Sequence, residues 1–138
     1  MQLRPHLNFN GQCEAAFKFY EKCLGGKISF IMTYGDSPAA AHVPSEYHEK
    51  IIHASFSKDG DTLFSGADGW GEHYHKPQGF AVTIETPDPA EADRIYKCLS
   101  DKGAIRMAIQ ETFWARRFAM FTDQFGTPWM INCGKPQT

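Results

Sequence analysis

The sequence predicts an α+β fold in which two tandem βαβββ modules form curled mixed sheets with a concave cup. Three observations lead to this prediction: a chain of 138 residues, two helical stripes that match at one offset, and short alternating strands around each stripe. The length is typical of one domain. We therefore expect a single domain over residues 1–138, built from modules at about 1–70 and 77–135.

Two segments carry apolar residues at helical spacing. CEAAFKFYEKCLGG ends at a Gly pair, and PDPAEADRIYKCLSDKG begins with Asp88 as the N-cap before Pro89 and is closed by Gly103. Their apolar stripes are Ala16, Phe17, Tyr20, Cys23 and Leu24 in the first, and Ala92, Ile95, Tyr96 and Leu99 in the second. At one constant offset, Ala15, Lys22, Cys23 and Leu24 of the first segment match Ala90, Lys97, Cys98 and Leu99 of the second. This repeat predicts a duplicated module.

Short strands flank each predicted helix. LRPHLNF precedes the first helix, and KISFIMTY, KIIHASFS and TLFSG follow it; GFAVTIE precedes the second, and AIRMAI, RFAMFT and PWMIN follow it. Asp59-Gly60 predicts a tight hairpin turn, and Asp123 to Gly126 suits a type I turn. Residues 35–50, with Pro38 and Pro44, form an insert that we interpret as a loop over the site.

Composition restricts the partners. Lys and Arg number 14 against 16 Asp and Glu, with no long run of one sign, so nucleic acid is not an expected partner. The sequence has no apolar stretch long enough for a membrane span. Its four cysteines form no CxxC pair and no leader precedes them, which favours the cytoplasm. Each module exposes a sheet edge and one helix-free face, which predicts a homodimer; whether modules pair within one chain or across the dimer stays open.

Alternation along two strands predicts a polar face. If Leu7 and Phe9 face the helix, then Arg4, His6 and Asn8 face away; if Ile52, Ala54 and Phe56 face the helix, then His53, Ser55 and Ser57 face away. Convergent polar groups in a cup are typical of a small-molecule site, so we expect His6, Asn8, His53 and Ser55 to contact a ligand. The alternative is that the histidines are structural and the others solvated. His73 and His75 lie in a Gly- and Lys-rich loop, and no metal is expected there.

With the duplicated module, the motifs FNGQCEAAFKFY and QETFWARRFAMFTDQFGTPWMIN make the chain similar to the PhnB-like branch of the vicinal oxygen chelate (VOC) superfamily. The resemblance implies the glyoxalase/bleomycin-resistance fold over nearly the whole chain. Metal-dependent members carry a carboxylate ligand on the last strand, four residues after the Gly of the preceding turn, where this chain has Met130. A thioether does not suit Mg²⁺ or Mn²⁺, so we expect no metal or other cofactor, with Met130 as a ligand contact.

The distinctive C-terminal motif contains the carboxylate of Glu111, whose role is open. The carboxylate precedes a strand and stands beside Phe113 and Trp114, which could form an apolar wall that raises its pKa and suits acid–base catalysis. The alternative is a salt bridge to Arg116 or Arg117. In the catalytic interpretation, Glu111 and His53 face one cavity walled by Trp114.

Two functions follow from these residues. The first is binding of a small metabolite in the cup, with the reaction unassigned, as in the bleomycin-binding relatives that the resemblance implies. The second is an enzyme of the lyase, isomerase or transferase type, acting on a small oxygenated metabolite with Glu111 as acid or base, with or without a metal. The fold alone does not choose between them.

Overall fold

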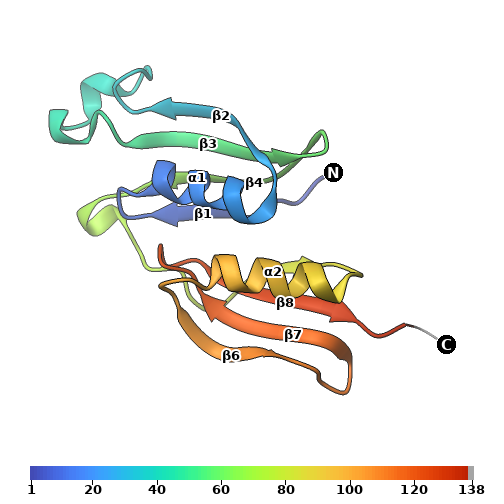
Figure 1. Cartoon of the computed structure of the whole chain (residues 1–138). Helices are drawn as coiled ribbons and strands as arrows, with labels where there is room; N and C mark the ends of the chain where they lie inside the picture. The colour runs from blue at the N-terminus through green and yellow to red at the C-terminus, as the bar shows by residue number, and fades with distance from the viewer. Residues whose placement is uncertain (137–138) are drawn as a thin grey trace. The chain divides into compact units, whose positions relative to one another are not determined.

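A computed structural model describes residues 1–136. The chain divides into two compact units, one of residues Met1–Lys76 and one beginning at Pro77. Each unit consists of a four-stranded mixed sheet and one helix (Figure 1). The predicted α+β fold with two βαβββ modules is therefore confirmed. Over the described residues, neither helix has the length and apolar character that crossing a bilayer requires.

The first unit places its N-terminal strand beside its last one. The elements are β1 (His6–Phe9), α1 (Cys13–Leu24), β2 (Lys27–Thr33), β3 (Ile51–Lys58) and β4 (Asp61–Asp68). The strand order is β1-β4-β3-β2. β1 runs parallel to β4, whereas the other two pairs are antiparallel. The long β2–β3 connection contains two short 3₁₀ turns, Ala40–His42 and Ser45–Tyr47.

The apolar stripe of α1 forms the core of the first unit. All five predicted stripe residues are buried. Phe17 lies edge-on to the ring of Phe64, with 5.4 Å between the ring centroids, and also contacts Phe9 and Phe56 edge-on. The helix ends at Gly25, whose φ of 79° is the left-handed conformation that glycine adopts without a Cβ clash. One helix therefore covers one face of the sheet and leaves the other face free of helix.

The second unit repeats this topology. Its elements are β5 (Val82–Glu85), α2 (Pro89–Leu99), β6 (Ala104–Gln110), β7 (Ala115–Thr122) and β8 (Pro128–Gly134). The strand order is β5-β8-β7-β6, again with the first strand parallel to the last. Ala92, Ile95 and Leu99 of α2 are buried.

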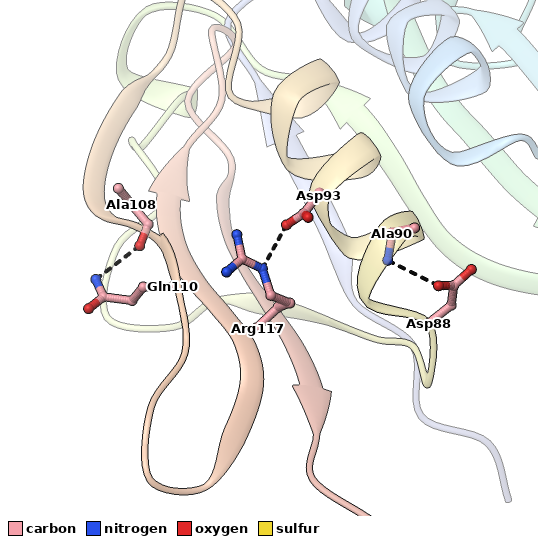
Figure 2. A network of polar contacts seen from close by, with 6 residues as sticks. All are labelled: Asp88, Ala90, Asp93, Ala108, Gln110 and Arg117. Carbon is pink, nitrogen blue, oxygen red and sulfur yellow. Dashed lines mark hydrogen bonds and ion pairs between the residues drawn. The ribbon is translucent and has the colours of Figure 1, made fainter.

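Side-chain contacts fix both the start and the orientation of α2 (Figure 2). Asp88 accepts a hydrogen bond from the Ala90 amide at 3.0 Å, which confirms it as the N-cap, and Pro89 is the first helical residue. Arg117 of β7 donates from Nε to Asp93 Oδ1 at 2.7 Å and so links the sheet to the helix. On the neighbouring β6, Gln110 donates from Nε2 to the Ala108 carbonyl.

Gly103 does not close α2, contrary to the sequence prediction. The helix ends at Leu99 with Ser100 as its C-cap. A Cβ on Gly103 would lie 2.3 Å from the Thr122 carbonyl oxygen, well inside contact distance. Glycine is therefore required because the chain passes against the end of β7 at this point.

Both predicted turns are present. Asp59 and Gly60 have φ values of 53° and 85°, as a two-residue hairpin of the I′ type requires between β3 and β4. Between β7 and β8, the Gly126 amide donates to the Asp123 carbonyl. The Asp123 carboxylate also accepts from the Phe125 and Thr127 amides and from Trp129 Nε1, which fixes this turn to the core.

One strand departs from simple alternation. On β3, Ala54 and Phe56 are buried as predicted, but Ile51 is buried instead of Ile52. The pairing with β2 shifts register here, since Met32 lies opposite His53 and Thr33 lies opposite Ile51. A bulge of this kind adds one residue to a strand and reverses the faces beyond it.

Candidate functional site

The helix-free face of the first unit carries a compact group of polar side chains, His6, His53, Ser55 and Ser65, which we call the histidine–serine cluster. His6 Nδ1 and Ser65 Oγ lie 2.6 Å apart, and Ser55 Oγ and His53 Nε2 lie 3.4 Å apart. The two imidazole rings are nearly parallel, at an interplanar angle of 16°, and their centroids are 6.1 Å apart.

Strand register explains how the cluster forms. Ser65 of β4 lies opposite His6 on one side and Ser55 on the other. Paired residues in neighbouring strands point to the same face of a sheet, so these side chains converge although they are far apart in sequence. Their strand neighbours Leu7, Ala54 and Phe64 are buried on the opposite face. Strand alternation predicted that His6, His53 and Ser55 share one face, and the structure confirms this; Ser65 was not predicted.

The surroundings of His6 favour its neutral form. Partial burial lowers the pKa of His6 below its usual value, and the nearby His53 lowers it further. The uncharged imidazole therefore persists to a lower pH than in a solvated histidine. A neutral imidazole has one donor and one acceptor nitrogen, so it can hydrogen-bond a ligand hydroxyl or carbonyl and can accept a proton.

Asn8 lines an adjoining pocket of about 430 Å³ where β1 and β4 end. Trp70 and Tyr34 meet edge to face in its wall with ring centroids 5.1 Å apart, and Tyr47 stacks on Trp70 at 4.7 Å. The other lining residues are His42, Ala67, Asp68, Gly69 and His73. His42 belongs to the insert of residues 35–50, so part of that insert borders the pocket, as a loop over the site would.

The insert is held in place by its own hydrogen bonds. The Nε2 atom of His48 lies 3.0 Å from the Ala40 carbonyl oxygen and 2.8 Å from the Val43 carbonyl oxygen. The Gly35 amide donates to the His48 carbonyl at 2.9 Å. Sequence reasoning missed His42 as a lining residue because nothing in the local pattern of a Pro-containing loop fixes where its side chains point. His73 also lines the pocket, although the sequence indicates only that it lies with His75 in a Gly- and Lys-rich loop.

Asp68 has a structural position in the pocket wall. It is 3% exposed, and its two carboxylate oxygens accept from the Cys13 and Ile51 amides, each at 2.9 Å. Burial raises the pKa of Asp68, while the amide donors and Lys50 oppose that rise. The carboxylate thus joins the start of α1, the start of β3 and the end of β4, and it was not recognised from the sequence.

Glu111 lies in the second unit, in the loop between β6 and β7. Its side chain is 68% exposed, and its Oε2 lies 3.5 Å from Lys135 Nζ. The salt bridge to Arg116 or Arg117, which was the alternative to a catalytic role, does not form. Arg117 pairs with Asp93 on α2, and Arg116 donates to the Gly134 and Pro87 carbonyls. The arginines of β7 are therefore engaged by other elements, and Glu111 pairs with the residue that follows β8.

Phe113 and Trp114 form an aromatic tip on the same loop. Phe113 is 88% exposed and Trp114 is 44% exposed. Trp114 lies edge-on to Phe113 and to Phe118, with centroids 4.7 Å and 5.1 Å away. Because Glu111 and His53 belong to different units, their predicted shared cavity stays a prediction.

Within the described strands, Met130 has no carboxylate among its cross-strand neighbours. On β8 it pairs with Met120 of β7 and Thr83 of β5, so its nearest cross-strand partners offer one sulfur and one hydroxyl. Such donors do not fit a hard divalent cation, which prefers carboxylates and other oxygen ligands. Within residues 1–136, no three of His, Cys, Asp and Glu come together in a group that could hold a metal ion.

Comparison with known proteins identifies relatives of this architecture. Residues 5–131 match the model of the Glyoxalase/Bleomycin resistance protein/Dioxygenase superfamily. Protein YjdN of Escherichia coli strain K12 is 34% identical, with 99% of this chain and 98% of that protein covered.

Two solved structures share the fold. Protein PA1353 from Pseudomonas aeruginosa is 35% identical with a TM-score of 0.85, and 99% of each chain is covered. The PhnB protein from Bacillus cereus is 23% identical with a TM-score of 0.79, covering 96% of this chain and 98% of that one. Both structures share the fold that the sequence motifs indicate. The chain belongs to the Glyoxalase/Bleomycin resistance protein/Dioxygenase superfamily, also called the vicinal oxygen chelate superfamily.

Proposed function

We propose that this protein binds a small metabolite and that the histidine–serine cluster contacts it. The observation that supports this most directly is the pair of near-parallel imidazoles, His6 and His53, each beside a serine hydroxyl on a face that no helix of their unit covers. A structural histidine pair would be expected in the core, whereas His53 is exposed. Convergent donors and acceptors of this kind orient small ligands.

The surroundings of the cluster favour a planar or partly aromatic ligand. The ring centroids of Phe30, on β2, and His53 are 5.9 Å apart, and Phe30 is 46% exposed. The adjoining pocket offers the Asn8 amide beside the rings of Tyr34 and Trp70. Aromatic faces contribute stacking, and the imidazole, amide and hydroxyl groups would fix orientation.

A fragment screen by NMR on the whole protein tests this proposal. Planar fragments carrying carbonyl or hydroxyl groups should shift the imidazole signals of His6 and His53. The substitution His53→Ala should lower the affinity for these fragments about tenfold. His75→Ala, in the exposed loop, is the matched control and should leave binding unchanged. Fragments that bind equally well to His53→Ala would refute the cluster as the ligand contact.

Ligand binding should not need a divalent metal, because the family's carboxylate position is Met130 and its cross-strand partners are Met120 and Thr83. We expect dialysis against a chelator to leave both the melting temperature and fragment binding unchanged. Differential scanning fluorimetry before and after dialysis measures this. A fall in melting temperature that one added metal reverses would contradict the expectation.

We also propose that the protein assembles as a homodimer. Large apolar side chains are exposed on strand β2 and strand β6 and on the loop after β6, among them Phe30, Ile31, Ile105 and Phe113. A second copy of the chain would remove them from water. Analytical ultracentrifugation at micromolar concentration should give the mass of two chains, whereas a monomer would contradict the proposal.

Catalysis by Glu111 is the alternative function. A general acid or base must lie within hydrogen-bond reach of the group it serves. The exposure of Glu111 and its contact with Lys135 instead favour an indirect role that acts through Lys135.

A further inference from the structure

A second pocket, of about 510 Å³, opens in the second unit where β5 and β8 end. Its lining includes Glu85, Arg116, Asn132 and Lys135. It lies outside the histidine–serine cluster, which belongs to the first unit. Two cationic side chains and one carboxylate line it, so its chemistry favours an anion.

Arg116 supplies a positive charge whose position is fixed. Its Nε donates to the Gly134 carbonyl at 3.1 Å and its Nη2 donates to the Pro87 carbonyl at 2.5 Å. These bonds orient the guanidinium but do not neutralise it, because carbonyls carry no net charge. Within residues 1–136 no carboxylate pairs with Arg116. The remaining N–H groups of its five donors are available to a carboxylate.

Asn132 supplies an acceptor that lacks a donor. Its Oδ1 atom is buried, and among the described residues nothing donates a hydrogen bond to it. Buried side-chain oxygens are normally satisfied, so an exception in a pocket wall indicates a missing partner. The partner must carry a hydrogen, as a hydroxyl does.

Lys135 supplies the second cation, and Glu111 competes for it. The Glu111 carboxylate lies 3.5 Å from Lys135 Nζ, and both side chains are substantially exposed. An exposed ion pair of this kind is weak and exchanges readily with a dissolved anion. Glu111 therefore acts on this pocket through Lys135.

We propose that this pocket binds a small 2-hydroxycarboxylate. The carboxylate of the ligand pairs with Arg116 and Lys135, and its hydroxyl donates to Asn132 Oδ1. Glu85 repels a second negative charge, which favours a monoanion. Glu111 lowers affinity by holding Lys135, so this carboxylate regulates the pocket and does not contact the ligand. The inference is independent of the function proposed for the first unit.

The test titrates the whole protein with L-lactate and with propionate, which differ by the hydroxyl group, while NMR follows the Asn132 amide and the Arg116 Nε–H. Lactate is expected to bind in the millimolar range and about tenfold more tightly than propionate. Arg116→Gln should weaken both acids about tenfold or more. If neither acid shifts these signals, or if Arg116→Gln binds both as well as before, the pocket is not an anion site and the proposal is overturned.

Two further variants separate the hydroxyl contact from the charge. Asn132→Leu removes the acceptor and should abolish the preference for lactate while propionate still binds; Asn132→Ala serves the same purpose if the leucine variant does not fold. Equal binding of the two acids to the unaltered protein would overturn the hydroxyl contact and leave a water molecule as the partner of Asn132.

Glu111→Gln should tighten the binding of both acids severalfold because Lys135 is released. The control is Glu46→Gln, which changes the net charge equally at an exposed position in the first unit and should have no comparable effect. If Glu111→Gln weakens binding instead, Glu111 is itself a ligand contact and its regulatory role is refuted.

Discussion

Asp68→Asn is expected to lower the free energy of unfolding by about 1–3 kcal/mol, although it changes one atom in a side chain that is 3% exposed. The carboxylate accepts from the Cys13 amide with Oδ1 and from the Ile51 amide with Oδ2. An asparagine has one oxygen and one NH₂ group, so one of these buried amides would face a donor. Urea denaturation of both proteins at neutral pH measures the difference.

The same substitution should also change the dependence of stability on pH. Burial raises the pKa of Asp68, so the folded protein holds this proton more tightly than the unfolded chain does. Stability from this group therefore falls as the pH rises from about 4 through the folded pKa, and Asp68→Asn should remove that component.

Asp61→Asn is the control, because Asp61 lies at the exposed start of the same strand. Its effect should stay within about 0.5 kcal/mol. An Asp68→Asn protein as stable as the unaltered one would show that the cost of burying the charge outweighs both hydrogen bonds.

Gly103→Ala is expected to destabilise the protein by about 3 kcal/mol. The added Cβ would lie 2.3 Å from the Thr122 carbonyl oxygen and 3.2 Å from the Asp123 Cα. Both are backbone atoms of the β7–β8 turn, so no side chain can rotate away to make room. The chain must shift at the base of the turn that Asp123 fixes. The midpoint of urea denaturation reports this loss.

Gly134→Ala is the matched control for this prediction. A Cβ at Gly134 meets no atom within 4 Å, and its φ lies outside the left-handed region. The same added methyl group should therefore change stability by about 0.5 kcal/mol or less. Equal losses in the two variants would show that steric overlap is not the cause.

Local patterns predicted the elements because they are encoded by neighbouring residues. The stripe of α1, the cap at Asp88 and the Asp59-Gly60 turn each depend on contacts within a few positions, and all are observed. Alternation also placed His6 and His53 on one face. It failed at Ile52, where a bulge reverses the phase, since no residue type marks the bulge in advance.

The partners of charged side chains were harder to predict because many of them are backbone groups far away in the sequence. Arg116 bonds to the carbonyls of Gly134 and Pro87, and side-chain patterns carry no information about carbonyl positions. For Glu111 the sequence left open a catalytic role or a salt bridge to the neighbouring arginines, but strand pairing brings Lys135 to it from the end of β8. Asp68 was missed because buried carboxylates are rare and its donors are backbone amides.

The parallel pairing of β1 with β4 has a consequence for the order in which the first unit folds. The ribosome makes β1 and α1 first, yet Leu7 of β1 has its partner in Gly66, near the end of the unit. The β3–β4 hairpin can form from adjacent segments, whereas β1 must close a long chain loop, which is slow and entropically costly. During translation, the part of the apolar stripe that packs on β4, such as the face of Phe17 against Phe64, therefore stays exposed until β4 has left the exit tunnel, and the nascent first unit is most prone to aggregate in that interval.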